Sequence, residues 1–238
     1  MGGMRTTKEL IELCSITRDS YVLDLGCGVG ATSCYLAKKF GCRVTGIDVS
    51  PKMIKWSKKR VQRDHVENRV ELQVADAHAL PFESNSFDVV LIESVLIFVK
   101  NKYQALSECV RVLRQGGFLG INEEIWLKPP TVALIAYSMC TWDIEDSILT
   151  TKNLLALLSQ CGLDNLEART YKFNASLKEY FDEITRYRFE DYLVMVYKAI
   201  MLFIKSSAFR KYIIAKYRFV HRQFFDYLGY GIYIGRKA

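Results

Sequence analysis

The segment VLDLGCGVG, residues 22–30, constrains the fold of this chain more than any other, because a short apolar run breaks there into three alternating glycines. It belongs to a series of short apolar runs that alternate with stretches of helical periodicity. The runs that predict strands are Tyr21–Leu25, Arg43–Asp48, Val70–Ala75, Phe87–Ile92 and Gly117–Asn122. The stretches that predict helices are Thr6–Ile16, Ala31–Phe40, Pro51–Gln62 and Lys102–Arg114. Because nearly continuous apolar strands belong to sheets covered on both faces, the sequence predicts an α/β fold with a doubly wound, mostly parallel sheet.

The chain after residue 125 follows a looser pattern. Thr150–Cys161 predicts a helix and Leu163–Phe173 a strand, whereas residues 176–228 show no strand-like alternation and predict helices. A strand directly after a helical excursion indicates an insert between the two closing strands of one sheet. We therefore expect a single domain over residues 1–238, with a core over about 6–125, a helical insert over 176–228 and a closing strand over 230–236.

The excess positive charge of the chain lies in one segment. The formal net charge is +7, and the stretch from residue 192 to residue 225 holds seven lysines and arginines with no acidic residue. The overall charge therefore does not by itself indicate nucleic-acid binding. Seven cysteines without a CxxC pair, and histidines at no ligand-like spacing, favour reduced thiols in a cytoplasmic protein and no metal site. The longest nearly uncharged apolar stretch, residues 192–204, is shorter than the roughly 20 residues of a membrane-spanning helix.

The three glycines of the opening segment predict a ligand site. Gly26, Gly28 and Gly30 lie between the first strand and the helix that follows it. In a doubly wound sheet, ligands bind at this carboxyl edge of the strands, and a missing Cβ lets a ligand approach the backbone closely. The glycines alone fit a dinucleotide site, another adenosine cofactor or a purely structural turn, and these alternatives stay open at this point.

Acidic residues at the ends of three consecutive strands narrow the choice. Asp24 closes the first strand, Asp48 ends the second about 20 residues beyond the loop, and Asp76 follows the third. A carboxylate at the position of Asp48 can accept hydrogen bonds from both hydroxyls of a ribose. Asp76 is placed to meet the exocyclic amine of an adenine. Together the three acids indicate an adenosine with a polar, positively charged extension.

Five segments carry a resemblance to a known family. VLDLGCGVG, VTGIDVSPKMI, VADAHALPF, FDVVLIESVL and VLRQGGFLGINE resemble the successive motifs of class I S-adenosylmethionine-dependent methyltransferases. Within them the chain looks most like the type 11 branch, which contains the ubiquinone and menaquinone methyltransferases and many small-molecule relatives. The resemblance implies a Rossmann-like fold with an antiparallel last strand. It also implies S-adenosylmethionine as cofactor, S-adenosylhomocysteine as product, and a one-carbon transferase activity.

The resemblance also implies which residues hold the cofactor. They are Asp24, Gly26, Gly28 and Gly30 at the methionine part, Asp48 at the ribose hydroxyls, Val49 and Met53 beside the adenine, and Asp76 with the Ala77 backbone at the adenine edge. Glu93, at the end of the fourth strand, would face the methyl group. Glu93 and the pair Glu123 and Glu124 are candidate catalytic bases. A base is needed only for an acceptor that arrives protonated, so whether one is used stays open.

Several alternatives remain beside a methyltransferase that moves a methyl group by in-line displacement to a small, partly apolar acceptor. The acceptor could be an RNA or a protein. A nicotinamide-dependent oxidoreductase would use Gly26, Gly28 and Asp48 in a similar way, but it would not explain Asp76 and the ALPF sequence.

The insert, residues 176–228, holds 14 of the 30 aromatic residues and suggests three roles. A cap over an acceptor pocket is favoured, because such pockets are mainly apolar. A homodimer surface or core extension and a peripheral membrane contact remain alternatives. Nucleic acid is not favoured, because stacking requires exposed rings and many of these lie in apolar runs.

Overall fold

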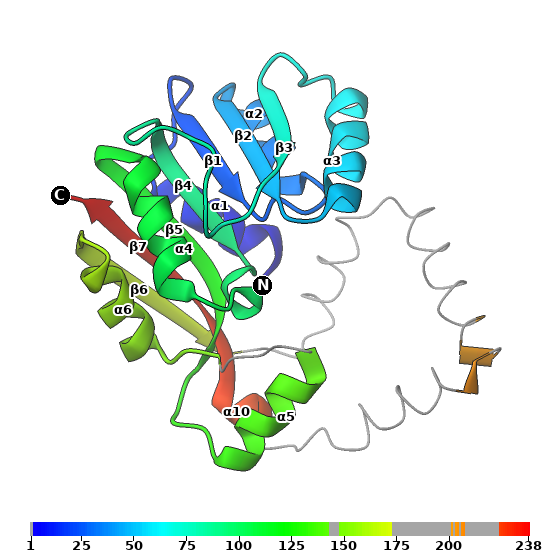
Figure 1. The fold of residues 1–238 in the computed structure, drawn as a ribbon, viewed down its shortest axis with the longest axis vertical. Helices are drawn as coiled ribbons and strands as arrows, with labels where there is room; N and C mark the ends of the chain where they lie inside the picture. The colour runs from blue at the N-terminus through cyan, green and yellow to red at the C-terminus, as the bar shows by residue number, and fades with distance from the viewer. Residues whose placement is uncertain (1, 143–147, 173–200, 202, 205, 208–223) are drawn as a thin grey trace.

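A seven-stranded sheet forms the centre of the structure. The computed structural model describes residues 2–142, 148–172, 201, 203–204, 206–207 and 224–238 of the chain. In these residues the strands lie in the order β3-β2-β1-β4-β5-β7-β6 (Figure 1). Their bounds are β1 Tyr21–Leu25, β2 Arg43–Asp48, β3 Val70–Val74, β4 Phe87–Glu93, β5 Leu113–Trp126, β6 Leu163–Lys172 and β7 Leu228–Lys237.

Helices connect and cover these strands. Their bounds are α1 Gly3–Leu13, α2 Ala31–Phe40, α3 Pro51–Arg63, the 3-10 helix η1 Leu96–Phe98, α4 Lys102–Val112, α5 Val132–Trp142, α6 Thr151–Gln160 and α10 Phe224–Tyr227. The side chains of Ser50, Asn101 and Thr150 cap α3, α4 and α6 by accepting hydrogen bonds from backbone N–H groups of the first turn. Among the described helices, none is both long and apolar enough to cross a membrane.

Apolar side chains of the sheet alternate between two cores. In β1, Val22 packs in the core that contains residues of α1, α2 and α3, whereas Leu23 packs in the core that contains residues of α4 and α6. In β4, Val89 and Val90 divide in the same way. This alternation follows from the two-residue period of a strand. Both faces are therefore covered, as predicted for a doubly wound sheet.

The closing strand β7 runs antiparallel to the rest of the sheet. The first five strands form parallel pairs, whereas β7 pairs antiparallel with both β5 and β6. In Figure 1 the arrow of β7 accordingly points opposite to that of β1. The predicted antiparallel last strand is confirmed, and it begins at Leu228, which the sequence analysis had assigned to the insert. Most of the predicted helical insert, residues 176–228, lies outside the described residues and stays a prediction.

Two elements differ from their predicted bounds because of tertiary pairing. The helix predicted to reach Arg114 ends at Val112, and Leu113 instead pairs with Phe87 at the start of β5. At its other end β5 reaches Trp126 and not Asn122, because β7 supplies a pairing partner beyond the end of β4. The helix predicted over Thr6–Ile16 occupies Gly3–Leu13, and α5 and η1 were not predicted.

Helix α1 packs very closely on β5. A Cβ atom at Gly120 would lie 2.5 Å from Cys14 Sγ, 2.9 Å from Leu10 Cδ1 and 3.0 Å from Leu91 Cδ2. Polar contacts also join α1 to the closing strands, since Tyr171 Oη and Arg169 Nη1 each donate to Glu9 Oε1 at 2.7 Å. The closeness of α1 matters for function because its side chains reach the carboxyl edge of the sheet.

The contact beneath α1 predicts the effect of Gly120→Ala. We expect the added methyl group to lower the free energy of unfolding by about 1–3 kcal/mol, the usual cost of overpacking. Cys14→Ala removes the nearest atom, so the same substitution in that background should cost less. Chemical denaturation of the four variants of this cycle measures the difference. An equal loss in both backgrounds would contradict the packing described here.

Candidate active site

The turn between β1 and α2 leaves an open space beside the backbone. Gly26 and Gly28 both have positive φ values, of 71° and 54°, which glycine adopts without strain. A Cβ at Gly26 would collide with the side chain of Val95. A Cβ at Gly28 would meet no atom within 4 Å. Close packing against Val95 therefore explains why position 26 is a glycine, whereas Gly28 borders a space that a ligand can enter. Gly30, also with positive φ, precedes α2 and packs against Ser57.

Asp24 lies fully buried at the end of β1. Burial, together with the nearby carboxylates of Glu93 and Asp48, raises the pKa of its carboxyl group to about 7. A hydrogen bond from Ser33 Oγ, at 2.5 Å from Asp24 Oδ2, acts in the opposite direction. A buried acid of this kind gains most from a ligand that brings a positive charge.

Asp48 joins the end of β2 to the glycine turn. Its Oδ2 accepts a hydrogen bond from the Gly28 N–H at 3.0 Å, and its Oδ1 accepts one from the Ser50 N–H at 2.8 Å. The next side chain, Val49, is 70% exposed, and Met53 lies half-buried in the first turn of α3. The structure thus brings the predicted ribose acid and two apolar side chains to the edge of the same turn.

Asp76 lies exposed just beyond β3. Its Oδ1 accepts hydrogen bonds from the His78 N–H at 2.9 Å and contacts His78 Nδ1 at 2.7 Å, and these contacts lower the pKa of Asp76. Ala77 packs at the border of the core on the α4 side. The imidazole of His78 therefore fixes the loop that carries the predicted adenine-edge acid.

Glu93 connects four elements at the carboxyl edge. Its Oε2 accepts from Thr7 Oγ1 of α1 at 2.7 Å and from Asn122 Nδ2 of β5 at 3.4 Å. Its Oε1 accepts from Thr32 Oγ1, in the first turn of α2, at 2.8 Å. These three neutral donors hold the carboxylate in place, so Glu93 is positioned as a fixed negative charge.

Glu123 and Glu124 have different surroundings although they are neighbours in β5. Glu123 Oε2 accepts from the N–H groups of Val95 and Leu96 at 2.9 and 2.6 Å, and its Oε1 accepts from the Glu124 N–H at 3.2 Å. Glu124 is 8% exposed, and its Oε2 has no hydrogen-bond partner among the described residues. Burial raises the pKa of each carboxyl group to about 7. Glu123 therefore holds the loop after β4, and Glu124 keeps an acceptor atom available.

The donors that hold these acids were not predicted from the sequence. Thr32 and Ser33 directly follow the glycine turn, where hydroxyl groups at a helix start give a recognisable signal. Thr7 and Asn122 give no such signal, because their contacts with Glu93 span 86 and 29 residues of sequence. The donors of Asp24, Asp48 and Glu93 in the described part of the chain are hydroxyls, one side-chain amide and backbone N–H groups.

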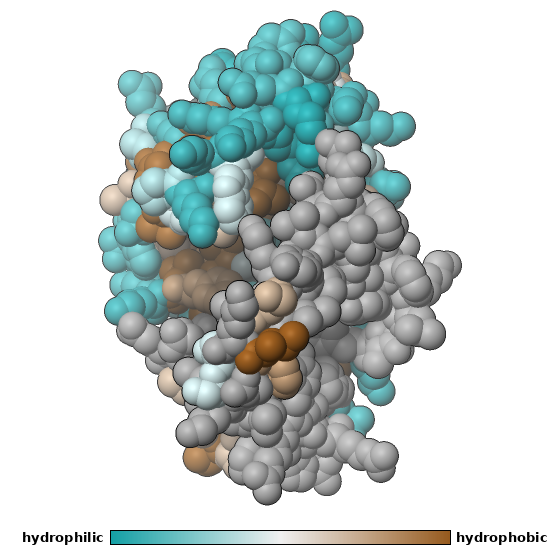
Figure 2. Space-filling view, turned by 90° about the vertical axis from the view of Figure 1, so that its right-hand side faces the viewer, coloured by the Kyte–Doolittle hydropathy of each residue, from teal (hydrophilic) through white to brown (hydrophobic). Residues whose placement is uncertain are grey.

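The site therefore combines clustered acids with an open, partly apolar rim. Figure 2 shows a recessed apolar area below the hydrophilic upper part of the molecule. Val74, at the end of β3, is 49% exposed. Three carboxylates, an open glycine turn and exposed apolar side chains fit an adenosine that carries positive charge. Among the described residues no group of three or more histidines, cysteines or acids could hold a metal ion.

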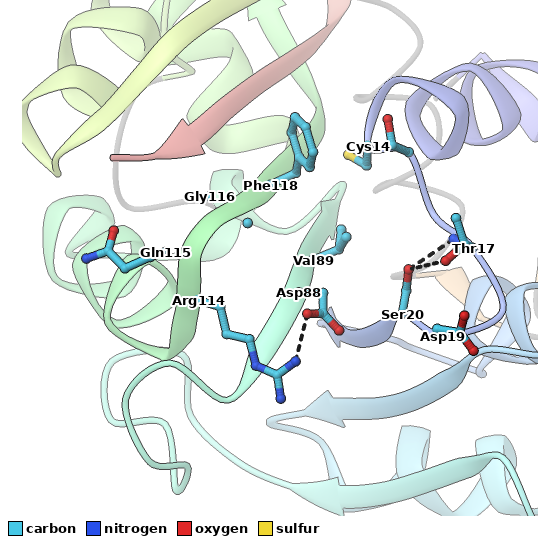
Figure 3. A pocket seen from close by; sticks show the side chains of 12 residues that line it. Cys14, Thr17, Asp19, Ser20, Asp88, Val89, Arg114, Gln115, Gly116 and Phe118 are labelled. Carbon is cyan, nitrogen blue, oxygen red and sulfur yellow. Dashed lines mark hydrogen bonds and ion pairs between the residues drawn. The ribbon is translucent and has the colours of Figure 1, made fainter.

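A second hollow, of about 390 Å³, lies at the opposite edge of the sheet (Figure 3). There Arg114 Nη1 contacts Asp88 Oδ1 at 2.8 Å, and the Tyr21 N–H donates to Asp88 Oδ2 at 2.7 Å. The protein itself thus uses both oxygens of this carboxylate to join the starts of β1, β4 and β5. The Asp88 carboxylate in this hollow therefore has a structural role.

Comparison with known proteins agrees with this geometry. Residues 23–121 match the model of the family described as "Methyltransferase domain". Methyltransferase GfsG of Streptomyces halstedii is 34% identical over 167 residues, which are 69% of this chain and 60% of that protein. The chain spans less than two thirds of the length of this relative and of the next two curated relatives.

Solved structures share the fold over nearly the whole chain. The crystal structure of MccD protein is 25% identical, with a TM-score of 0.75 and coverage of 98% of this chain and 96% of that one. The [4+2]-cyclase SpnF has a TM-score of 0.76 at 22% identity and covers 98% of this chain and 80% of its own. The second likeness concerns the fold alone.

The fold is that of the class I S-adenosylmethionine-dependent methyltransferases. Within this class, residues 23–121 form a methyltransferase domain of the type 11 branch.

The raised pKa of Asp24 predicts how stability depends on pH. Its pKa is about 7 in the folded chain against 3.8 for an unperturbed aspartate, so the folded state keeps a proton that the unfolded chain loses. This contribution to stability is complete below about pH 4 and disappears as the pH rises to about 7. Glu123 and Glu124 act in the same direction. The free energy of unfolding of the unmodified chain should therefore change between about pH 4 and pH 7 by a few kcal/mol more than that of Asp24→Asn, since one pKa unit corresponds to about 1.4 kcal/mol. Chemical denaturation at a series of pH values measures the difference.

The exposed Asp19 supplies the matched variant, and Asp19→Asn should retain the slope of the unmodified chain. If Asp24→Asn kept that slope as well, the carboxyl group would not hold its proton in the folded state.

The open space at Gly28 predicts a loss of ligand affinity on substitution by alanine. Gly28→Ala should cost about 1–2 kcal/mol of stability because of its positive φ. Its methyl group should also raise the dissociation constant of S-adenosylhomocysteine at least about tenfold, measured by calorimetric titration. Gly162 is the matched control, because it too has positive φ and no atom within 4 Å of its Cβ position, yet it lies after α6. Equal affinity in both variants would show that the space beside Gly28 is not occupied by ligand.

Proposed function

We propose that this protein is a methyltransferase that uses S-adenosylmethionine to methylate a small, partly apolar acceptor at the carboxyl edge of its sheet. The observation that carries this proposal is the cluster of Asp24, Asp48 and Glu93 beside an open glycine turn, with neutral donors only among the described residues. Carboxylates held by neutral donors, one of them fully buried, favour a ligand with positive charge, which the sulfonium and ammonium groups of this cofactor provide.

The residues at the turn suit the parts of the cofactor in order. Gly28 and Asp24 would border the methionine part, and Asp48 would accept hydrogen bonds from the ribose hydroxyls. Val49 and Met53, with Asp76 and the Ala77 backbone in addition, would surround the adenine. The 70% exposed side chain of Val49 supports this assignment, because it offers an apolar surface that a flat ring can cover.

When bound, the cofactor supplies a methyl group that its own sulfonium activates. The chain has to place the acceptor in line with that methyl group and to exclude water, and positioning of this kind can contribute about 7–11 kcal/mol. Glu93 is suited to a positioning role, because Thr7, Thr32 and Asn122 fix its carboxylate at the edge where the acceptor must arrive. The Glu123 carboxylate is turned to backbone amides, which argues against its use as a base.

A small-molecule acceptor is favoured over an RNA or a protein by relatives whose names specify such an acceptor, among them phosphoethanolamine N-methyltransferase 1 of Arabidopsis thaliana, which is 29% identical over 189 residues. The roles suggested for the insert, namely acceptor cap, homodimer surface or membrane contact, depend mostly on residues outside the described part of the chain and stay predictions. A nicotinamide-dependent oxidoreductase is disfavoured by the family match.

A thermal-shift comparison tests the proposed cofactor. S-adenosylhomocysteine at 100 times its dissociation constant should stabilise the folded chain by about 2.7 kcal/mol, whereas NAD should not. Asp48→Ala should weaken binding of S-adenosylhomocysteine by about 1–3 kcal/mol, because the ribose hydroxyls would lose their acceptor. Asp19→Ala, at an exposed position of the opposite edge, should bind normally. Stabilisation by NAD and not by S-adenosylhomocysteine would refute the proposal.

A further inference from the structure

The end of β5 extends beyond the edge of the parallel strands. The last pair between β4 and β5 joins Glu93 to Asn122, whereas β5 continues to Trp126 beside β7. We refer to residues 123–126 as the overhang. At about 3.3 Å per residue, Glu124 stands about 7 Å beyond Asn122 along the strand. Because the side chain of Asn122 contacts Glu93, the overhang rises directly above the cluster of acids proposed to meet the cofactor.

Within the overhang, the fold explains the position of the Glu123 carboxylate but not that of the Glu124 carboxylate. The carboxylate of Glu123 is fully engaged with three backbone N–H groups. Glu124 is 8% exposed, yet its Oε2 has no hydrogen-bond partner among the described residues. A buried acid without a partner destabilises a fold, so such groups are concentrated at functional sites.

The surroundings of Glu124 are mostly apolar. Trp126, Ile97 and Leu228 form a buried apolar cluster at the end of the overhang. Lys102, which is 6% exposed, lines a small cavity together with Glu123 and Glu124. That cavity, of about 10 Å³, has room for about one water molecule and not for an acceptor. The acceptor must therefore reach Glu124 from the side of the carboxyl edge.

From this arrangement, we infer that the carboxylate of Glu124 binds the reacting group of the acceptor, and that this group is the hydroxyl of a largely apolar molecule such as a phenol. The inference rests on the proposed function. A hydroxyl can donate its proton to the unpartnered oxygen while its body packs against apolar side chains. A protonated amine lacks a lone pair for methylation, and it would meet like charge from the cofactor sulfonium.

In this assignment Glu124 is a general base. The acceptor hydroxyl gives its proton to Glu124 Oε2 as its oxygen forms the new bond to the methyl carbon. The bond between that carbon and sulfur breaks, and its electron pair stays on sulfur as a neutral thioether. The proton then leaves Glu124 for water, so that charge and atoms balance. The raised pKa of Glu124, about 7, suits a group that takes up and releases a proton near neutral pH.

Phenol and benzylamine are the probes for this inference, because they share an aromatic body and differ in charge at neutral pH. Saturation-transfer NMR on protein saturated with S-adenosylhomocysteine should show phenol binding at millimolar concentration. The signal should fall at least about fivefold in Glu124→Leu and remain in Glu167→Leu, a matched change at an exposed position of β6. Glu124→Gln should retain part of the binding. In the complex with S-adenosylmethionine, whose sulfonium carries the like charge, benzylammonium should bind more weakly than phenol to the unmodified chain.

Titration with S-adenosylhomocysteine separates this inference from the proposed function. Normal affinity of Glu124→Leu for that product, with phenol binding lost, supports both. Phenol binding that is absent from the unmodified chain, or equal in Glu124→Leu, overturns the inference and leaves the cofactor proposal intact. Stronger binding of benzylammonium overturns the hydroxyl assignment. Thermal unfolding gives a further readout, because a functional carboxylate leaves Glu124→Leu at least as stable as Glu167→Leu, and a lower midpoint would indicate a structural role instead.

Discussion

Negative charge gathered at one edge of the sheet is the constraint on which the site depends. Asp24, Asp48 and Glu93 end three adjacent strands, and the latter two both raise the pKa of the first. Hydrogen bonds from hydroxyl and amide donors offset the repulsion between these carboxylates. Such donors hold the carboxylates in position without cancelling their charge. A positively charged cofactor is the ligand that this arrangement stabilises best.

The donors also explain why distant elements converge on the site. Thr7 belongs to α1, Thr32 to α2 and Asn122 to β5, and all three hold the carboxylate of Glu93. Helix α1 can take part only because Gly120 lets it pack closely on β5. The same helix is joined to the closing strands through Glu9, so the cofactor edge and the last two strands form one connected structure.

The overhang of β5 gives two neighbouring acids different tasks. Glu123 binds the loop after β4, and that loop places Val95 against Gly26. Glu124 keeps an oxygen for a partner that the described residues do not supply. One acid thus builds the site, while its neighbour keeps an oxygen that can react.

The sequence by itself determined the alternation of strands and helices, the glycine turn and the strand-end acids, because each depends on residues close together in the chain. Helix α2 and strands β1 and β2 have the predicted bounds for that reason. Only the tertiary structure decided that β5 runs on to Trp126, because its partner β7 lies about a hundred residues further along the chain. It alone also decided which acids are paired and which are not. Glu93, Glu123 and Glu124 were all candidate bases in the sequence, and their hydrogen bonds could not be predicted because contacts across 27 to 86 residues leave no local pattern.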